Sequence, residues 1–281
     1  MSPLVSVVVP VFNGIPHLRD LTDSLLAQTY PNLEIVFSEG GSTDDSPAYL
    51  ATIDDPRVRT INAPPGTGAA GNWTAASEAA TGEFVKLVCQ DDLLRPDAIA
   101  KQVDDLTRHP EAAMAVAQRD VIDAKGNLLY ARRGCSGLKA GVMHGPDVIR
   151  AAYLTGTNVL GEPLAVLFRR ETLFAALPWV DTDPFMLDLD LYARAARNSE
   201  IVVRKESIGS FRVSTSSWST RLAGEQVRQF ERWQNTYAAS LPTPPGGAER
   251  ARAKLGLHLQ ALLRRGAYRW LSLKGSLKSS H

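Results

Sequence analysis

Residues 4–10 read LVSVVVP, an unbroken β-branched run, and residues 17–28, HLRDLTDSLLAQ, follow it with apolar residues at helical spacing. The alternation recurs in LEIVFS at 33–38, VRTIN at 58–62 and FVKLVC at 84–89, with helical segments between them. Continuous apolar strands are typical of a parallel sheet that is covered on both faces. Four β-α units in the first hundred residues therefore predict an α/β fold with a mainly parallel sheet and flanking helices.

The second half of the chain is less regular, although helical and extended patterns still alternate. A helix is expected from Pro96 to about His109, and the Asp-x-x-Gly-Asn turn near residue 125 predicts a hairpin. The remaining expected elements are strands at 112–118 and 163–170, a helix at 184–197, a closing pair of strands at 200–205 and 207–213, and helices after about 222.

Composition places the chain among ordinary globular proteins. Its 281 residues are 44% hydrophobic and 22% charged, and the formal net charge is +1, which gives no argument for a nucleic-acid partner. Cys89 and Cys135 cannot form a disulfide framework, and no apolar run reaches the roughly 18 residues that span a bilayer. No signal peptide is recognisable, so we expect a cytoplasmic protein.

Charge is nevertheless unevenly distributed along the chain. The last of the 30 acidic residues is Glu249, whereas eight of the 31 basic residues come after it. Residues 221–281 therefore form a basic, helical C-terminal extension, with Leu255, Leu259, Leu262, Leu263 and Trp270 on one side. Such a helix lies on anionic lipid, peripherally at the inner face of the membrane, or packs on the catalytic domain or a dimer partner; both readings stay open.

A glycine-rich loop raises one alternative function. Residues 66–71, GTGAAG, match the dinucleotide-binding pattern GxGxxG, and Asp91 lies 20 residues further on. In that pattern the first glycine turns directly off the strand, whereas residues 63–65, APP, intervene here. We therefore interpret the loop as a flexible segment before a helix that Asn72 caps.

Carboxylates follow two of the first four strands. EGGSTD (39–44) ends the second strand and CQDD (89–92) ends the fourth. The carboxyl ends of parallel strands meet at one edge of a sheet, where ligands bind. Grouped carboxylates without a histidine and cysteine cluster favour Mn²⁺ or Mg²⁺ shared with phosphate oxygens, rather than zinc. The alternative is that Asp91 and Asp92 only cap the next helix.

The segments VSVVVPVFNG, LAQTYPNLEIVFSEGGSTDDS and AATGEFVKLVCQDDLLRPDAI together resemble the nucleotide-binding half of the family 2 glycosyltransferases. The resemblance continues through FRRETL, FMLDLDLYARAAR and FRVSTSSWS, and so covers about residues 4–220. It implies a Rossmann-like GT-A fold over residues 1–220, with residues 1–95 binding the nucleotide-sugar and residues 96–220 binding the acceptor.

The resemblance also implies which residues bind the donor, with a UDP-sugar as the expected donor. Pro10 and Phe12 border the base, together with Asn13 of the same PVFN segment. Glu39 stands for the first aspartate of the family's DDGSTD loop, which also contains Ser42. The extra methylene of glutamate alters its reach toward the base or ribose.

Asp91 is the expected metal ligand. The family's Asp-x-Asp motif corresponds to Cys89-Gln90-Asp91, which retains only the last aspartate. Asp92 follows as a second donor-site carboxylate, and Arg212 is expected to close over the diphosphate.

Asp188 is the expected catalytic base, because the family places an aspartate, often after a glutamate, at the start of a helix. Leu187 replaces that glutamate here. Asp190 is the alternative, but the two residues point about 200° apart on a helix, and Asp190 has Arg194 four residues later as an ion-pair partner.

The implied reaction is an inverting transfer of one sugar from a nucleotide-diphosphate sugar to a hydroxyl of a glycan or lipid-linked acceptor, in cell-surface polysaccharide or glycolipid biosynthesis. Glu162 is the candidate acceptor contact, unless it only forms a turn. The departures at Glu39, Cys89 and Leu187 keep open a non-catalytic sugar-nucleotide or glycan-binding module on the same fold. A nucleotidyltransferase is disfavoured, because residues 10–18, PVFNGIPHL, contain no lysine or arginine.

Overall fold

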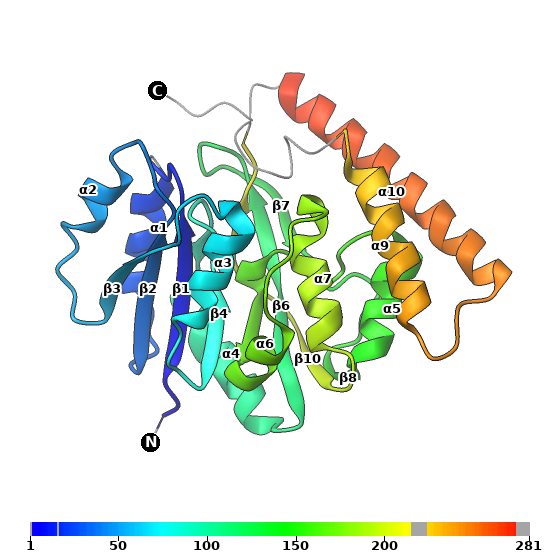
Figure 1. Cartoon of the computed structure of the whole chain (residues 1–281), viewed down its shortest axis with the longest axis horizontal. Helices are drawn as coiled ribbons and strands as arrows, with labels where there is room; N and C mark the ends of the chain where they lie inside the picture. Colours follow the sequence, from blue (N-terminus) through cyan, green and yellow to red (C-terminus); the bar gives the residue numbers. More distant parts are fainter. Residues whose placement is uncertain (1, 16, 215–223, 274–281) are drawn as a thin grey trace.

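The computed structural model describes residues 2–15, 17–214 and 224–273, with side chains up to residue 267 in the last helix. Its centre is one sheet with helices on both faces (Figure 1). The first four strands are all parallel and lie in the order β3-β2-β1-β4. Their bounds are β1 (Val5–Val11), β2 (Leu33–Glu39), β3 (Val58–Asn62) and β4 (Phe84–Leu87).

The strand order reverses at β1. The chain runs outward from β1 to β2 and β3, and then returns to place β4 on the other side of β1. Such a reversal opens a crevice at the carboxyl ends of the two central strands, where α/β folds bind ligands. The three connecting helices are α1 (His17–Leu26), α2 (Ser46–Leu50) and α3 (Gly68–Glu78).

The second half extends the same sheet with mixed pairing. β9 is antiparallel to both β4 and β6, whereas β10 is parallel to β6. The strands are β5 (Leu93–Leu94), β6 (Ala112–Ile122), β7 (Leu128–Arg133), β8 (Gly141–His144), β9 (Val166–Arg169) and β10 (Glu200–Arg212). The helices are α4 (Ala98–Arg108), α5 (Gly145–Thr155), α6 (Arg170–Ala176), α7 (Leu187–Ala195), α9 (Gln226–Ser240) and α10 (Gly247–Leu273), with 3-10 turns η1 (Pro163–Ala165) and η2 (Pro184–Met186).

The fold class predicted from the sequence is confirmed: helices cover a central α/β sheet whose first half is wholly parallel. The side chains of α1 and α4 form the core on one face of the sheet. Those of α3, α5, α6, α7 and α9 form the core on the other. The hairpin of β6 and β7 is also confirmed.

Three local expectations are wrong. One continuous strand, β10, replaces the expected closing pair, because irregular pairing with β6 between Arg204 and Ser210 absorbs the break in the pattern without a turn. The strand expected from residue 163 begins at Val166, after a 3-10 turn. Asn72 lies inside α3, which begins at Gly68, and donates from Nδ2 to the Val11 carbonyl oxygen, 3.0 Å away.

The C-terminal helix α10 crosses α5 at two glycines. Gly156 ends α5 in the left-handed conformation, with φ +66°, and a Cβ there would lie 2.2 Å from Leu257 Cα. A Cβ on Gly256 would lie 2.4 Å from the Leu154 carbonyl oxygen. Ala253, three residues earlier in α10, is also buried. The helices therefore approach more closely than side chains permit.

This crossing predicts that Gly256→Ala destabilises the protein by about 1–3 kcal/mol, because the new methyl group overlaps α5. Gly266→Ala in the same helix is the matched control, since nothing lies within 4 Å of a Cβ at that position. The control is expected to stabilise by up to about 1 kcal/mol through helix propensity. Thermal unfolding of both variants measures the difference, and equal melting temperatures would contradict the close crossing.

Candidate functional site

The loop that follows β1 is held to the loop that follows β4 by a reciprocal pair of hydrogen bonds. The Phe12 amide donates to Gln90 Oε1, 2.8 Å away, and Gln90 Nε2 donates to the Phe12 carbonyl oxygen, 2.9 Å away. Asn13 adopts a φ of +50°, and the Phe12 ring is 56% exposed. The two loops thus form one edge of the crevice, with an exposed aromatic ring on it.

The loop that follows β2 contacts the same edge. Ser42 Oγ accepts a hydrogen bond from the Asn13 amide, at 2.9 Å. The carboxylate of Glu39 accepts from the amides of Gly41 and Ser42, at 2.9 and 2.6 Å. Partial burial acts to raise the pKa of Glu39, but these hydrogen bonds outweigh it, and the pKa lies below its usual range. Glu39 is therefore an ionised carboxylate that shapes its own loop.

Asp92 lies fully buried beneath the half-buried Asp91. Its Oδ1 accepts from the Arg212 amide at 3.2 Å, while its Oδ2 has no hydrogen-bond partner among the described residues. Burial and the Asp91 carboxylate raise the pKa of Asp92 well above its usual range. The interpretation of this pair as a helix cap is wrong, because α4 begins at Ala98 with Asp97 as its cap residue.

Arg212 is buried, and its guanidinium is bound largely within the protein. Its Nε donates to the Asp91 carbonyl oxygen at 2.9 Å, and its other nitrogens donate to Ala124 O and to the Asp20 carboxylate. This residue therefore fixes the backbone of the Asp91 loop.

Asp188 lies in the first turn of α7, in the other half of the chain. Its Oδ2 accepts from Asn158 Nδ2 at 2.9 Å, and its Oδ1 from the Leu189 amide at 2.7 Å. Burial, and then the Glu162 carboxylate, raise the pKa of Asp188 to about 7. Asp190 instead forms an ion pair with Arg194 at 3.0 Å, as the helical spacing predicted.

Glu162 lies next to Asp188 and is paired with Arg119. The Arg119 guanidinium donates to both carboxylate oxygens of Glu162, with Nη2 to Oε1 at 2.7 Å. Arg119 is only 9% exposed, and the charge of Glu162 raises its pKa despite burial. The ion pair thus places a carboxylate, with its countercharge, beside Asp188.

Four carboxylates lie close enough to Cys89 to act on its thiol. Burial raises the pKa of the Cys89 thiol, and the charges of Asp92, Asp91, Asp188 and Glu162 raise it further. The structure therefore brings the expected metal ligand and the expected base, nearly a hundred residues apart in sequence, into the surroundings of the same thiol.

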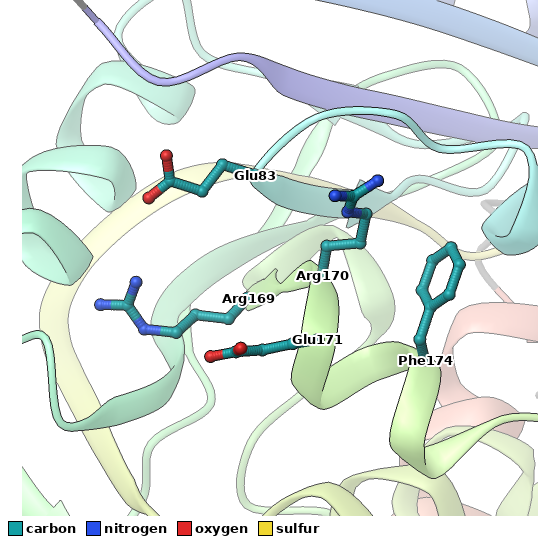
Figure 2. A pocket seen from close by; sticks show the side chains of 5 residues that line it. All are labelled: Glu83, Arg169, Arg170, Glu171 and Phe174. Carbon is teal, nitrogen blue, oxygen red and sulfur yellow. The ribbon is translucent and has the colours of Figure 1, made fainter.

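A separate hollow of about 470 Å³ lies at the opposite end of the sheet, where β4 begins and β9 ends (Figure 2). Its lining residues are Glu83, Arg169, Arg170, Glu171 and Phe174. The labelled side chains point in different directions and do not converge on one point. Arg169 is already hydrogen-bonded to three backbone carbonyls. Because the hollow lies at the opposite end of β4 from Asp91, it is not part of the candidate site.

A profile of glycosyl transferase family 2 matches residues 6–173, which include Glu39, Asp91 and Glu162. The chain belongs to glycosyl transferase family 2. The expected family is confirmed, and with it the class of enzyme, a glycosyltransferase.

Relatives and solved structures agree with the family. An uncharacterised protein of Mycobacterium tuberculosis is 29% identical over 240 residues, which are 82% of this chain and 74% of that protein. A glycosyltransferase of Rickettsia typhi is 33% identical over 130 residues, which are 46% of this chain and 40% of that protein. The match therefore spans less than half of the Rickettsia relative.

Two solved structures have the same fold. TarS of Staphylococcus aureus (residues 1–349) aligns over 96% of this chain and 75% of its own, at TM-score 0.68 and 16% identity, and has also been solved with UDP-GlcNAc. A mannosyltransferase of Pyrobaculum calidifontis, in complex with GDP-Man and Mn²⁺, aligns over 100% of this chain and 77% of its own, at TM-score 0.65 and 21% identity.

The family 2 cleft contains residues that the sequence did not single out. Arg119, Asn158 and Gln90 each fix a predicted site residue or loop. A charged residue directly after the apolar run of a strand is a local indication that Arg119 could be buried and paired. Its partner, Glu162, lies 43 residues away, so the sequence alone does not identify the pair. Residues 215–219 of the family resemblance lie outside the described residues, so their part in the site stays a prediction.

The donor set of the cleft fits a hard divalent cation. Among the described residues, no three histidine, cysteine or acidic side chains are placed so that together they could hold a metal ion. However, Mg²⁺ and related ions bind through one or two carboxylates together with substrate phosphates. Asp91 supplies such a carboxylate at the cleft, and the buried Asp92 Oδ2 beneath it has no described partner.

The raised pKa of Asp188 predicts a pH-dependent effect on stability. The folded protein keeps this proton up to about pH 7, while the unfolded chain loses it near pH 4. The contribution of Asp188 to stability is therefore present below about pH 4 and is lost as the pH rises through 7.

Asp188→Asn removes this titration. The stability of the variant relative to the wild type should rise from pH 5 to pH 8, by at most about 1.4 kcal/mol for each pH unit within the window. Urea unfolding at the two pH values measures the change. The altered hydrogen bond to Asn158 changes the unfolding free energy by the same amount at both pH values, so it cannot produce a pH-dependent change. A difference in unfolding free energy between variant and wild type that is equal at pH 5 and pH 8 would contradict the raised pKa.

Proposed function

We propose that this chain transfers a sugar from a nucleotide-diphosphate sugar to an acceptor hydroxyl, with inversion at the anomeric carbon. The observation that carries the proposal is the Asp188 carboxylate, held by Asn158 in the cleft that also contains Asp91. Family membership supports the class of reaction, and the cleft supports the roles of the residues.

Asp188 has the properties of a general base. Each of its oxygens accepts one hydrogen bond from the protein and retains lone pairs that can face a substrate hydroxyl. A pKa of about 7 matches the operating pH, which balances the ionised fraction against proton affinity. As the acceptor oxygen bonds to the anomeric carbon, its proton moves to Asp188, and the bond to the nucleoside diphosphate breaks on the opposite face. A single displacement of this kind inverts the configuration.

The donor half of the site follows from the three loops at the ends of β1, β2 and β4. Phe12 offers an exposed ring for the base, while Pro10 is buried beneath that loop. Asn13 and Ser42 bond to one another, and Glu39 orders the loop beside them. The ordered loop supports binding of the base and ribose between Phe12 and Glu39. Arg212 would act on the diphosphate by fixing the Asp91 backbone.

Asp91 would hold a Mn²⁺ or Mg²⁺ ion with the donor diphosphate, and Asp92 would support that segment from below. When bound, such an ion neutralises the charge that develops on the leaving diphosphate. The complex of the Pyrobaculum mannosyltransferase with GDP-Man and Mn²⁺ supports this part of the proposal. The complexes of TarS with UDP-GlcNAc and of the mannosyltransferase with GDP-Man support a nucleotide-sugar donor, and the donor proposed here is a UDP-sugar.

The acceptor would be a glycan or lipid-linked glycan of a cell-surface polysaccharide or glycolipid. Glu162 borders the acceptor side, because it lies beside Asp188 while Arg119 holds both of its oxygens. Its role is then to align the hydroxyl near Asp188.

Asp188→Asn should lower turnover by at least about a hundredfold while donor binding persists, since general-base catalysis contributes roughly 10²–10⁴-fold. Asp190→Asn is the matched control, because Asp190 is already paired with Arg194 on the same helix. Release of nucleoside diphosphate measures turnover in both variants, and wild-type turnover should fall as the pH drops below about 7. Normal turnover in Asp188→Asn would refute the assignment.

Asp91→Asn should abolish the metal-dependent part of donor binding. The measurement is the melting shift caused by UDP, GDP, dTDP, CMP or NAD, each with and without Mn²⁺ or Mg²⁺. A ligand at 100 times its dissociation constant stabilises by about 2.7 kcal/mol. Asp45→Asn is the control, since Asp45 is exposed and makes no capping hydrogen bond.

Each outcome of the ligand panel has a distinct meaning. A metal-dependent shift with UDP that is lost in Asp91→Asn supports the proposed donor site. A shift with GDP instead corrects the nucleotide. A shift with NAD alone would favour the glycine-rich loop as the nucleotide site, and metal-independent binding without turnover would point to a binding module.

A further inference from the structure

The helix α10 has two apolar faces, and only one of them is packed. Ala253 and Leu257 are buried against the rest of the protein. On the opposite side are four exposed leucines, here called the leucine stripe: Leu255, Leu259, Leu262 and Leu263, which are 70%, 55%, 66% and 59% exposed. Their spacing of four, three and one residues places them within about 100° of arc on the helix.

The stripe is unusual for this molecule. Four of the nine large apolar side chains that are exposed among the described residues lie on this one helix face. Single exposed apolar residues are ordinary on protein surfaces, whereas a contiguous group marks an interaction surface.

Basic side chains border the leucine stripe. On a helical projection Lys254 and Arg265 lie along one side of it, and Arg252 lies in line with it, about one turn before Leu255. All three are exposed, and Lys254 contacts Glu231 only at 3.9 Å. The one acidic residue of α10, Glu249, is paired with Arg150 in the first turn.

We propose that the leucine stripe of α10 docks on an anionic lipid bilayer surface, with the helix lying in the plane of the membrane. An apolar stripe bordered by cations is the pattern of an interfacial helix: the leucines enter the acyl boundary and the cations contact anionic headgroups. The helix does not insert across the bilayer, since no helix of the described residues is long and apolar enough to cross one.

Charge favours a membrane over a second copy of the chain. Two copies that met through this face would bring two sets of arginines and lysines together, with no carboxylate on α10 beyond its first turn to compensate. An anionic surface compensates all of them.

The position of α10 determines which end of the molecule would lie near the membrane when the leucine stripe docks. The helix runs along the outside of the molecule, and its C-terminal turns lie at the end where strands β1 to β4 finish, at the top of Figure 1. Docking would therefore hold the acidic cleft close to the lipid surface. The proposal itself rests on α10 alone and is independent of the proposed reaction.

Vesicle flotation tests the proposal with the full chain. Wild-type protein should float with phosphatidylglycerol–phosphatidylcholine vesicles and remain behind with phosphatidylcholine alone. Leu259→Gln/Leu262→Gln should lower the partition coefficient at least tenfold, and Arg252→Gln/Arg265→Gln should remove the preference for anionic lipid. Leu259 and Leu262 belong to the leucine stripe, whereas Arg252 and Arg265 are basic residues next to it. All four side chains are exposed, so these substitutions should leave folding unaffected.

Leu128→Gln is the matched control, because Leu128 is 62% exposed on β7, away from α10. This control should float like the wild type. Unchanged melting temperatures would verify that every variant is folded, and sedimentation velocity would report the oligomeric state.

Three results would overturn the proposal. The first is wild-type protein that does not bind anionic vesicles. The second is a Leu259→Gln/Leu262→Gln variant that floats as well as Leu128→Gln. The third is a dimer that dissociates in the Leu259→Gln/Leu262→Gln variant with no change in flotation, which would make the stripe a contact between two copies.

Discussion

Parallel pairing of β4 with β1, on the side away from β2, is the constraint on which the acidic cleft depends. The register places Val5 beside Phe84 and Val8 beside Leu87, so the loops after both strands begin at the same level. Only then can Gln90 pair with the backbone of Phe12, 78 residues earlier. The other half of the site joins this frame through β9, which pairs with β4 and β6.

Crowding of like charges is the energetic cost of this arrangement. Burial raises the pKa values of Asp92 and Asp188; the Asp91 and Glu162 carboxylates raise that of Asp92 further, and Glu162 raises that of Asp188. Buried cations offset part of this repulsion. Arg119 neutralises Glu162 directly. Lys86, fully buried in β4, donates to Gln102 Oε1 at 2.7 Å and to two backbone carbonyls, while burial lowers its pKa to about 7. The free energy that this charge repulsion costs is therefore offset by the packing of the surrounding core.

The sequence predicted most of what depends on local pattern. The first four strands and the acidic loops follow from continuous apolar runs and from the residues that end them. Asp188 was separated from Asp190 by helical geometry, and the ion pair of Asp190 bears out that argument. What the sequence did not yield depends on distant partners. Asn72 lies inside α3 and donates a hydrogen bond to the Val11 carbonyl oxygen, and Arg119 is paired with Glu162, 43 residues away. No local rule encodes either contact.

The reciprocal bond between Gln90 and Phe12 has a thermodynamic consequence. It fuses the loop that carries the exposed aromatic ring with the segment that carries Asp91, before any ligand arrives. The conformational entropy of ordering these two loops is therefore spent during folding rather than during association. A molecule that touches both loops meets a single rigid surface, so its two ends contribute to affinity without a penalty for bringing the loops together.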